Sequence, residues 1–254
     1  MIRVAAVGDI HLGTDSAGSL RSELEDIAES ADVLLIAGDL TNTGTLEEAD
    51  VVARELDSLP IPTVVVLGNH DYHCGNEAHI RGRLEEAGVI VLEGETAEFD
   101  VNGLRLAVAG TKGFGGGFAG AHATEFGEPE MKNFVRHTKE LAGRLSDAVE
   151  SMDGDVKVVL MHYAPISHTL RGEPPEIYPF LGSYLLGEAV DVCGADLILH
   201  GHAHRGVEKG VTPGGILVRN VAQPVIRHVY NLYHFHPARQ RERVLEARAS
   251  GHQD

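Results

Sequence analysis

The chain has 254 residues, of which 43% are hydrophobic and 5% aromatic, and it contains no Trp. This length suffices for one large domain or two small ones with an aliphatic core. The formal net charge of -17 repels nucleic-acid phosphates at long range, so any phosphate that binds must be attracted by a local feature such as a metal ion.

The compartment is predicted from the absence of export and membrane signals. The apolar run within residues 1–13 is too short for a signal peptide with a cleavage site. No stretch approaches the 18 apolar residues of a membrane span. Cys74 and Cys193 are the only cysteines, and neither belongs to a CxxC pair, so a disulfide framework is not expected. We therefore expect a cytoplasmic protein without a membrane partner.

Apolar, β-branched runs alternate with helical patterns in the first part of the chain, which favours stacked βα units. Helices are predicted at about 19–30, 45–58, 77–87, 130–151 and 183–192. Strong strands are predicted at 2–8, 32–38, 63–68, 156–161 and 195–201, and weaker ones at 97–101, 104–110, 215–220 and 228–235.

No linker or internal repeat divides the sequence, so we expect one domain over residues 1–238. Residues 239–254 are charged and are predicted to form a surface helix or a tail. Two long segments, 110–127 and 163–183, are rich in Gly and Pro respectively. Loops of this length in a compact domain are usually functional or disordered. We expect both segments to set the shape of the pocket and the Gly-rich one to be a lid or rim.

Each of the five strong strands is followed by side chains that commonly bind metals. If the strands run parallel, these side chains meet at one edge of the sheet. In an extended chain, residues two apart point the same way, so the Asp-x-His and His-x-His pairs could each chelate one ion. A single Asp or His in such a place is usually a cap, a turn residue or a solvated side chain, but five coincidences favour a metal site. The residues are Asp9, His11, Asp39, Asn69, His70, Asp71, His162, His202 and His204.

The succession GDIH, GDLT, GNHD and GHAH, with a His between the last two, resembles the calcineurin-like metallophosphoesterases over roughly residues 2–236. The resemblance implies a mixed α/β fold, a four-layer α/β/β/α sandwich of two mixed β-sheets flanked by helices. It also implies a centre of two metals that hydrolyses phosphate esters, with His70 beside the metals. The implied ligands are Asp9, His11, Asp39 and His204 for one ion, and Asp39, Asn69, His162 and His202 for the other.

Mixed imidazole, carboxylate and amide ligands suit Mn, Fe, Zn, Co or Ni better than Ca or Mg, and we favour Mn or Fe. Two divalent ions carry four positive charges, and Asp9, Asp39 and a bridging hydroxide remove three, so the pocket would attract phosphate. Metal binding lowers the pKa of water from 15.7 to about 7, which would make the bridging hydroxide available to attack phosphorus. His70 is our candidate for assisting the leaving group, a contribution typically of about 10²–10⁴-fold.

Four further residues are candidates for supporting roles. Asn42 stands where many relatives carry an acidic residue, and we expect its amide to orient His70 without stabilising the charged imidazole. Asp71 either orients a ligand His or is a local turn residue. His168 and Arg171 lie in the Pro-rich loop and either contact substrate or are solvated.

These observations predict a dinuclear-metal phosphoesterase, a phosphodiesterase or phosphatase, that acts on a small phosphate ester. One alternative is a non-catalytic scaffold of the same fold that binds proteins, and the complete ligand set argues against it. The other is a nuclease, which the charge of -17 and the absence of a basic stripe disfavour. The choice between monoesters and diesters stays open, as does the oligomeric state.

Overall fold

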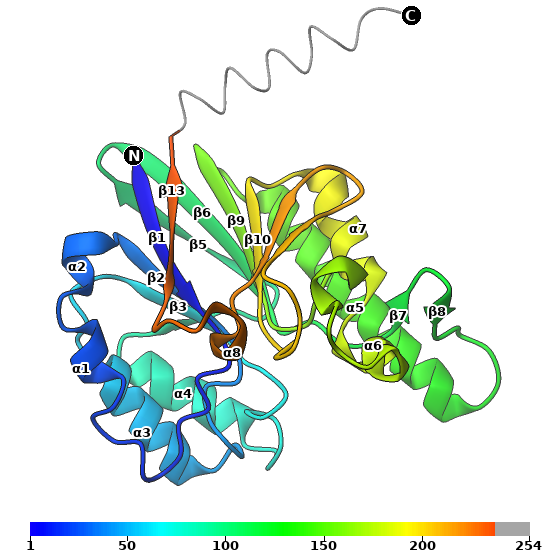
Figure 1. Ribbon diagram of the computed structural model, residues 1–254, viewed down its shortest axis with the longest axis horizontal. Coiled ribbons are helices and arrows are strands. Elements are labelled where there is room, and N and C mark those ends of the chain that lie inside the picture. Colours follow the sequence, from blue (N-terminus) through cyan, green and yellow to red (C-terminus); the bar gives the residue numbers. More distant parts are fainter. Residues whose placement is uncertain (237–254) are drawn as a thin grey trace, which may run out of the picture.

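Two mixed β-sheets lie face to face in the computed structural model, which describes residues 1–236 (Figure 1). The predicted segment 239–254 lies outside the described residues. In the first sheet, the four strands after the edge strand β13 are parallel to one another, and β13 pairs antiparallel with β1. The order is β13 (Asn231–Phe235), β1 (Ile2–Val7), β2 (Val33–Ala37), β3 (Thr63–Val66) and β4 (Ile90–Val91).

In the second sheet the four central strands are parallel and both edge strands are antiparallel to their neighbours. A two-stranded hairpin of β7 (Gly117–Phe118) and β8 (Ala121–His122) stands apart from both sheets. The order of the second sheet is β11 (Lys209–Val211), β12 (Leu217–Asn220), β10 (Leu197–His200), β9 (Val156–Met161), β6 (Leu104–Thr111) and β5 (Glu95–Val101).

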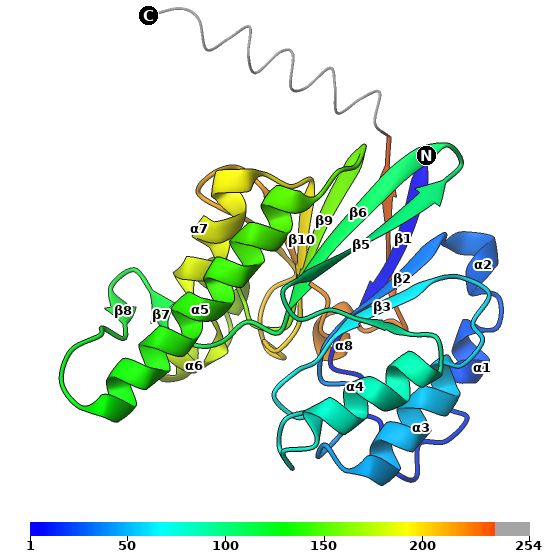
Figure 2. The ribbon, with the colours of Figure 1, turned by 180° about the vertical axis from the view of Figure 1, so that it is seen from behind.

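Helices cover the outer face of each sheet, as Figures 1 and 2 show from opposite sides. The second sheet is covered by α5 (Pro129–Ser151) and α7 (Tyr184–Cys193), and the amino-terminal part of α5 extends past the sheet towards β7 and β8. Short elements fill the connections: η1 (Ser167–Leu170), η2 (Pro175–Ile177), α6 (Tyr178–Leu181) and α8 (Gln223–Ile226). The first sheet is covered by α1 (Arg21–Leu24), α2 (Ile27–Ser30), α3 (Leu46–Leu56) and α4 (Glu77–Glu86).

The core follows from the period of two in the strands. Ile2, Val4 and Ala6 belong to the cluster between the two sheets, whereas Ala5 and Val7 belong to the cluster under α3 and α4. Successive side chains of a strand point to opposite faces, so β1 is buried on both sides. The predicted four-layer α/β/β/α sandwich is therefore confirmed.

The predicted elements are present, with two differences. The pattern at 19–30 forms two short helices, α1 and α2, instead of one. The start of α3 follows the prediction, because Thr45 and Glu48 form a capping box. The five strong strands are divided between two sheets, three in the first and two in the second. The single sheet edge expected for the ligand residues is thus wrong, and the residues instead come from both sheets.

The two long segments bind each other. The Gly116 N–H donates to the Pro179 carbonyl at 2.7 Å, and the Gly117 N–H donates to the Gly182 carbonyl at 2.9 Å. A Cβ atom on Gly115 would lie 2.5 Å from the Pro179 oxygen, so only glycine allows this approach. The glycine-rich segment is therefore fastened to the Pro-rich one. None of the helices among residues 1–236 combines the length and apolar character needed to cross a bilayer.

Candidate metal centre

The backbone at the strand ends is left-handed where ligands are predicted. The φ angles of Asp9, His11, Asp39 and His202 are 57°, 43°, 50° and 69°. They are four of the seven described non-glycine residues with positive φ. Such conformations cost on the order of 1–3 kcal/mol each and gather at functional sites. The extended geometry that we expected for the Asp-x-His and His-x-His pairs is therefore wrong, and tight turns aim these side chains.

Backbone hydrogen bonds hold the turns together. The Asp9 N–H donates to the Gly38 carbonyl at 2.9 Å, and the His11 N–H donates to the Asp39 carbonyl at 3.0 Å. The turn after β1 therefore lies along the turn after β2. From the second sheet, the His202 N–H donates to both carboxylate oxygens of Asp9 at 3.0 Å. These bonds join the carboxyl ends of the two sheets.

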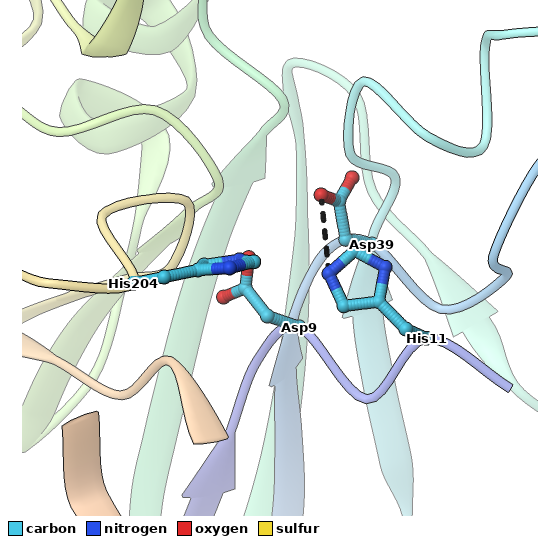
Figure 3. Close-up of side chains that lie close together, drawn as sticks. All are labelled: Asp9, His11, Asp39 and His204. Atoms are coloured by element: carbon cyan, nitrogen blue, oxygen red, sulfur yellow. Dashed lines mark hydrogen bonds and ion pairs between the residues drawn. The ribbon is translucent and has the colours of Figure 1, made fainter. Parts of the chain in front are cut away.

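A first group of ligand-type side chains consists of Asp9, His11, Asp39 and His204, which point toward one another in Figure 3. One ligand atom from each lies within 4.8 Å of those of the others. His204 Nε2 is 2.9 Å from Asp9 Oδ1, and His11 Nε2 is 3.8 Å from Asp39 Oδ2. The group is made of two imidazoles and two carboxylates, a donor set that suits a transition metal.

A second group shares one member with the first. Asp39, His162 and His202 again have ligand atoms within 4.8 Å of one another. His162 Nε2 lies 3.3 Å from Asp39 Oδ1 and 2.9 Å from the amide oxygen of Asn69. Asp39 therefore stands between the two groups. His202 and His204, whose spacing would have allowed them to chelate one ion together, belong to different groups, which is the division that the resemblance implies.

His11 tests whether metal ions fit these residues. Both ring nitrogens of His11 are buried, and neither has a hydrogen-bond partner among the described residues. Burial also lowers the pKa of His11, so the ring favours its neutral form, which is the form that binds metals. Buried polar atoms are nearly always paired, and leaving one unpaired costs free energy. An ion between His11 and the carboxylates would satisfy this ring, so the residues present fit a metal.

Carbonyl oxygens orient the two histidines of the second group. His162 Nδ1 lies 2.8 Å from the Ala37 carbonyl, and His202 Nε2 lies 3.3 Å from the Phe180 carbonyl. A carbonyl only accepts, so the facing nitrogen carries the proton and donates. The other nitrogen of each ring is then free to face the centre, which is how supporting contacts fix metal-binding histidines.

The charges of the second group are strongly coupled. Burial alone would lower the pKa of His162, but the Asp39 carboxylate raises it to about 9. Burial alone would raise the pKa of Asp39, but the charge and hydrogen bond of His162 hold it well below its usual range. In the protein alone the two side chains therefore form an ion pair. Burial, helped by the charge of His162, lowers the pKa of His202 to about 3, which keeps that ring neutral.

Asp71 binds backbone, and no hydrogen bond between its carboxylate and a histidine ring is present in residues 1–236. The buried carboxylate accepts from the Leu40 N–H at 3.2 Å, the Thr41 N–H at 2.9 Å and the Gly68 N–H at 2.8 Å. It also accepts from the Thr41 hydroxyl at 2.6 Å. Asp71 therefore fastens the turn after β2 to the turn after β3. A Cβ on Gly68 would collide with Asp39 Oδ1, so this packing requires glycine.

His70 is oriented by main chain, which corrects the role expected for the Asn42 amide. The His70 Nδ1 lies 2.6 Å from the Asn42 carbonyl oxygen, and the Asn42 residue is exposed. Because the carbonyl accepts, Nδ1 carries a proton and Nε2 faces the centre, 4.0 Å from Asp39 Oδ2. The His70 ring stands edge-on to His11 with centroids 4.5 Å apart. The side chain is 40% exposed, so substrate can reach it.

The other two candidates lie elsewhere. His168 is exposed on η1 and lines a cavity of about 640 Å³ with residues of β7, α7 and the turn after β11. Arg171 is exposed directly after η1, where it forms a β-bridge with Glu173. Within residues 1–236, neither side chain has a hydrogen bond or ion pair to a candidate ligand. Their contact with substrate stays a prediction.

Lys112 is a neighbour of the centre that sequence reasoning missed. Its ammonium lies 4.9 Å from the ring centroid of Tyr72, 5.0 Å from that of Phe114 and 5.2 Å from that of Tyr163. Burial lowers the pKa of Lys112, while Glu93 and Asp39 oppose this effect. The signal was present in the sequence, since Lys112 directly follows β6 as the ligand residues follow their strands. We had assigned it to a glycine-rich rim.

Known proteins resemble this chain in sequence and in fold. A probable rhamnogalacturonate lyase C of Emericella nidulans is 27% identical over 222 residues, which is 83% of this chain and 18% of that protein. A 3′,5′-cyclic-nucleotide phosphodiesterase of Nostoc sp. is 34% identical over 82 residues, 28% of this chain and 31% of that protein. The chain thus spans between about a fifth and a third of the length of these relatives.

A phosphopantetheinyl hydrolase of Mycobacterium tuberculosis has a similar fold, with a TM-score of 0.64 and 16% identity over 88% of this chain and 90% of that one. The sequence model of the calcineurin-like phosphoesterases matches residues 2–206. This range includes both groups of ligand-type residues as well as Asn69 and His70. The chain therefore belongs to the calcineurin-like phosphoesterase family.

Proposed function

We propose that this protein is a metal-dependent phosphoesterase with a dinuclear centre, in which Asp39 is shared by both ions. The observation that supports this proposal best is the position of Asp39 between two groups of ligand-type side chains. Asp9, His11 and His204 would complete one ion site, and Asn69, His162 and His202 the other. When bound, two such ions supply positive charge for the phosphate and activate water for attack on phosphorus.

The residues of the centre prepare it for a phosphate anion. Only two carboxylates, Asp9 and Asp39, belong to the two groups, so loaded ions would keep a net positive charge. This local charge offsets the repulsion that a chain of net charge -17 exerts on phosphate. We favour Mn or Fe among the transition metals that this donor set suits.

His70 assists the departure of the ester group in this proposal. Its Nδ1–H donates to the Asn42 carbonyl, which leaves Nε2 directed at the centre. Hydrolysis forms one bond from the water oxygen to phosphorus and breaks the ester P–O bond. The leaving oxygen then needs a proton, which protonated His70 Nε2 would donate. Such general acid catalysis is typically worth about 10²–10⁴-fold.

Both monoesters and diesters remain within the proposal. The Nostoc relative is described as a phosphodiesterase, which supports including diesters, but this chain spans only 31% of that protein. The non-catalytic scaffold is less well supported, because a scaffold does not need His11 as a buried ring without a partner. It also does not need an accessible His70.

The test is a metal reconstitution with paired substrates. Chelator-treated protein is loaded with Mn, Fe, Zn, Co or Ni, and hydrolysis of p-nitrophenyl phosphate is compared with that of its bis-ester. We expect uptake of about two ions per chain and hydrolysis of at least one ester. His70→Ala should lower kcat by about 10²–10⁴-fold, while His73→Ala, an exposed neighbour, should not. Uptake of two ions without hydrolysis of any phosphate ester would favour the scaffold.

A further inference from the structure

A group of aromatic rings extends outward from the candidate metal centre. The Tyr163 ring lies on His202 with centroids 4.4 Å apart, and Phe114 lies 5.8 Å from Tyr163. Phe134 follows at 5.1 Å from Phe114, and Phe180 at 6.4 Å from Phe134. These residues come from the ends of β6 and β9, from α5 and from α6. We call Phe114, Phe134 and Phe180 the aromatic shelf.

The composition of the chain makes this gathering unusual. The protein has no Trp, 7 Phe and 6 Tyr, and aromatic residues amount to only 5%. Four of these rings lie in one contact series that begins at a candidate ligand. Tyr163 belongs to one of the interior clusters and Phe114 packs against that cluster, whereas Phe134 and Phe180 belong to none of the interior clusters of the described residues. Core packing therefore accounts for the inner rings, and the outer rings Phe134 and Phe180 continue the series without such a role.

The shelf is open to solvent at its outer end. Phe180 is 61% exposed, and Phe114 and Phe134 are half-buried. An aromatic ring left in water loses the free energy that burial would provide, roughly 25 cal/mol per Å² of apolar surface. A single exposed apolar side chain is common on protein surfaces, whereas a contiguous apolar patch marks a binding site; the Phe180 ring continues into the half-buried rings of Phe134 and Phe114. Phe180 therefore offers a ring face to a ligand.

The backbone fixes the shelf in place relative to the centre. The Phe180 carbonyl accepts from His202 Nε2 at 3.3 Å, so the residue with the exposed ring also orients a candidate ligand. The Gly116 N–H donates to the Pro179 carbonyl, and Gly115 lies 3.2 Å, measured from an added Cβ, from the Phe134 ring. The glycine-rich segment thus contacts the Phe134 ring and the main chain next to Phe180. A ligand whose phosphate occupies the centre could rest its organic group on these rings.

We propose that the aromatic shelf is the specificity-determining surface of this enzyme and that it selects phosphate esters carrying a flat aryl or heteroaryl group. This proposal rests on the proposed phosphoesterase function. Rings prefer offset-stacked or edge-to-face contacts, which are worth about 0.5–1.5 kcal/mol beyond burial. That free energy corresponds to a roughly 2- to 12-fold preference for an aryl over an alkyl group.

Two phosphonates that cannot be hydrolysed as esters test the shelf without turnover. Phenylphosphonate and methylphosphonate carry the same anionic head, so their affinities for the metal-loaded protein differ through the organic group alone. Calorimetry of the wild type should give a Kd about tenfold lower for phenylphosphonate. Phe180→Ala keeps the main-chain carbonyl that faces His202 Nε2, and it should reduce this preference by about 3- to 10-fold, with a smaller change in the Kd of methylphosphonate than in that of phenylphosphonate.

Two further variants keep the test decisive. Phe126, which lies between β8 and α5, is 84% exposed and has no ring contact among the described residues, is the matched control. Phe126→Ala should keep the full preference. Phe180→Leu retains an apolar side chain of similar bulk, so it serves if the alanine variant fails to fold, and it should still lose most of the preference.

The outcomes separate this proposal from the proposed function. Equal affinity of the wild type for both phosphonates, with hydrolysis of esters intact, would overturn the shelf alone. An equal loss in Phe126→Ala and Phe180→Ala would also overturn it, because the effect would then be unrelated to the ring series. A retained preference for phenylphosphonate in a protein that hydrolyses no ester would support the shelf as a binding surface and contradict the phosphoesterase.

Discussion

The two sheets supply the candidate centre in different ways. The loops after β1, β2 and β3 of the first sheet bind one another through backbone groups, and Asp71 accepts three N–H groups from two of these loops. The second sheet supplies histidine rings that distant carbonyls orient, Ala37 for His162 and Phe180 for His202. We call the hydrogen-bonded turns after β1, β2 and β3 the frame, and they form the first half of the centre. The second half consists of His162 and His202 from the second sheet, whose rings depend on contacts with remote segments.

This difference predicts how many ligand residues a substitution in each half of the centre should displace. A change in the frame moves several ligands together, because the turns after β1, β2 and β3 share hydrogen bonds. A change in the second half should affect one ring at a time, since each histidine has its own carbonyl. Asp39 belongs to the frame and yet serves both groups, so it connects the two halves.

Replacing Asp39 should have the largest effect. Asp39→Asn keeps the size of the side chain but removes the shared carboxylate, so both ion sites lose a charged ligand. We expect the metal content to fall from about two ions per chain to below one, and kcat for p-nitrophenyl phosphate to fall by at least about 10³-fold. Elemental analysis and a colorimetric assay measure the two quantities.

The control for this prediction is Asp32→Asn. Asp32 pairs with Arg3 at 2.7 Å, near the opposite ends of the strands, so its loss removes a charge of the same sign without touching the centre. It should leave metal content unchanged. Retention of two ions by Asp39→Asn would contradict the claim that both ion sites need the Asp39 carboxylate.

Gly68→Ala tests the rigidity of the frame. The added Cβ would collide with Asp39 Oδ1, and the turns cannot separate without losing the bonds that the Leu40 and Thr41 N–H groups donate to Asp71. We expect a loss of activity of roughly 10²-fold, in line with the cost of small displacements of catalytic groups. Gly82→Ala is the matched control, because its Cβ would meet nothing within 4 Å in the helix α4. That variant should raise the free energy of unfolding by up to about 1 kcal/mol.

Sequence reasoning predicted the frame well for a physical reason. Asp9, Asp39 and Asn69 each follow a strand within a few residues, so pattern and position in the chain are enough to bring them together. The aromatic shelf could not be predicted in this way. Phe134 and Phe180 lie 46 residues apart and meet only because the glycine-rich segment fastens α6 beside α5.

Two expectations from the sequence were wrong for the same reason, because contacts between remote segments decide the outcome. We expected the side chain of Asn42 to orient His70, but the backbone carbonyl does so, and the identity of a residue does not reveal what its main chain contacts. We expected extended backbone at the ligand pairs, but the left-handed φ angles of Asp9 and His202 arise from tertiary contacts between turns. Neither feature has a signature in the sequence.

Metal uptake by the second group of ligands should depend on pH, because His162 must lose a proton before it binds an ion. The Asp39 carboxylate raises the pKa of His162 to about 9, against the effect of burial. Below that pH the ring holds a proton that must leave before Nε2 can bind an ion. Affinity of this site should therefore rise about tenfold per pH unit from pH 6 to 8 and level off near pH 9.

Calorimetry in buffers of different ionisation enthalpy measures the proton released on metal binding. Near pH 7 the second ion should release about one proton from His162. His162→Gln should abolish that release while the first group, which lacks His162, still binds its ion. Unchanged proton release in His162→Gln would mean that the proton comes from another group, such as His204, whose pKa the hydrogen bond to Asp9 raises.

The smallest effect is expected at Asn42, where main chain and side chain can be separated. Asn42→Ala keeps the carbonyl that accepts from His70 Nδ1 at 2.6 Å and removes only an exposed amide. We expect kcat within about threefold of the wild type, since exposed substitutions away from bonded groups change little. The dependence of kcat on the pKa of the leaving group, measured with a series of aryl phosphates, should also be unchanged. A steeper dependence in Asn42→Ala would show that the amide acts on His70 after all, and the frame would then orient its acid through a side chain as the second half does.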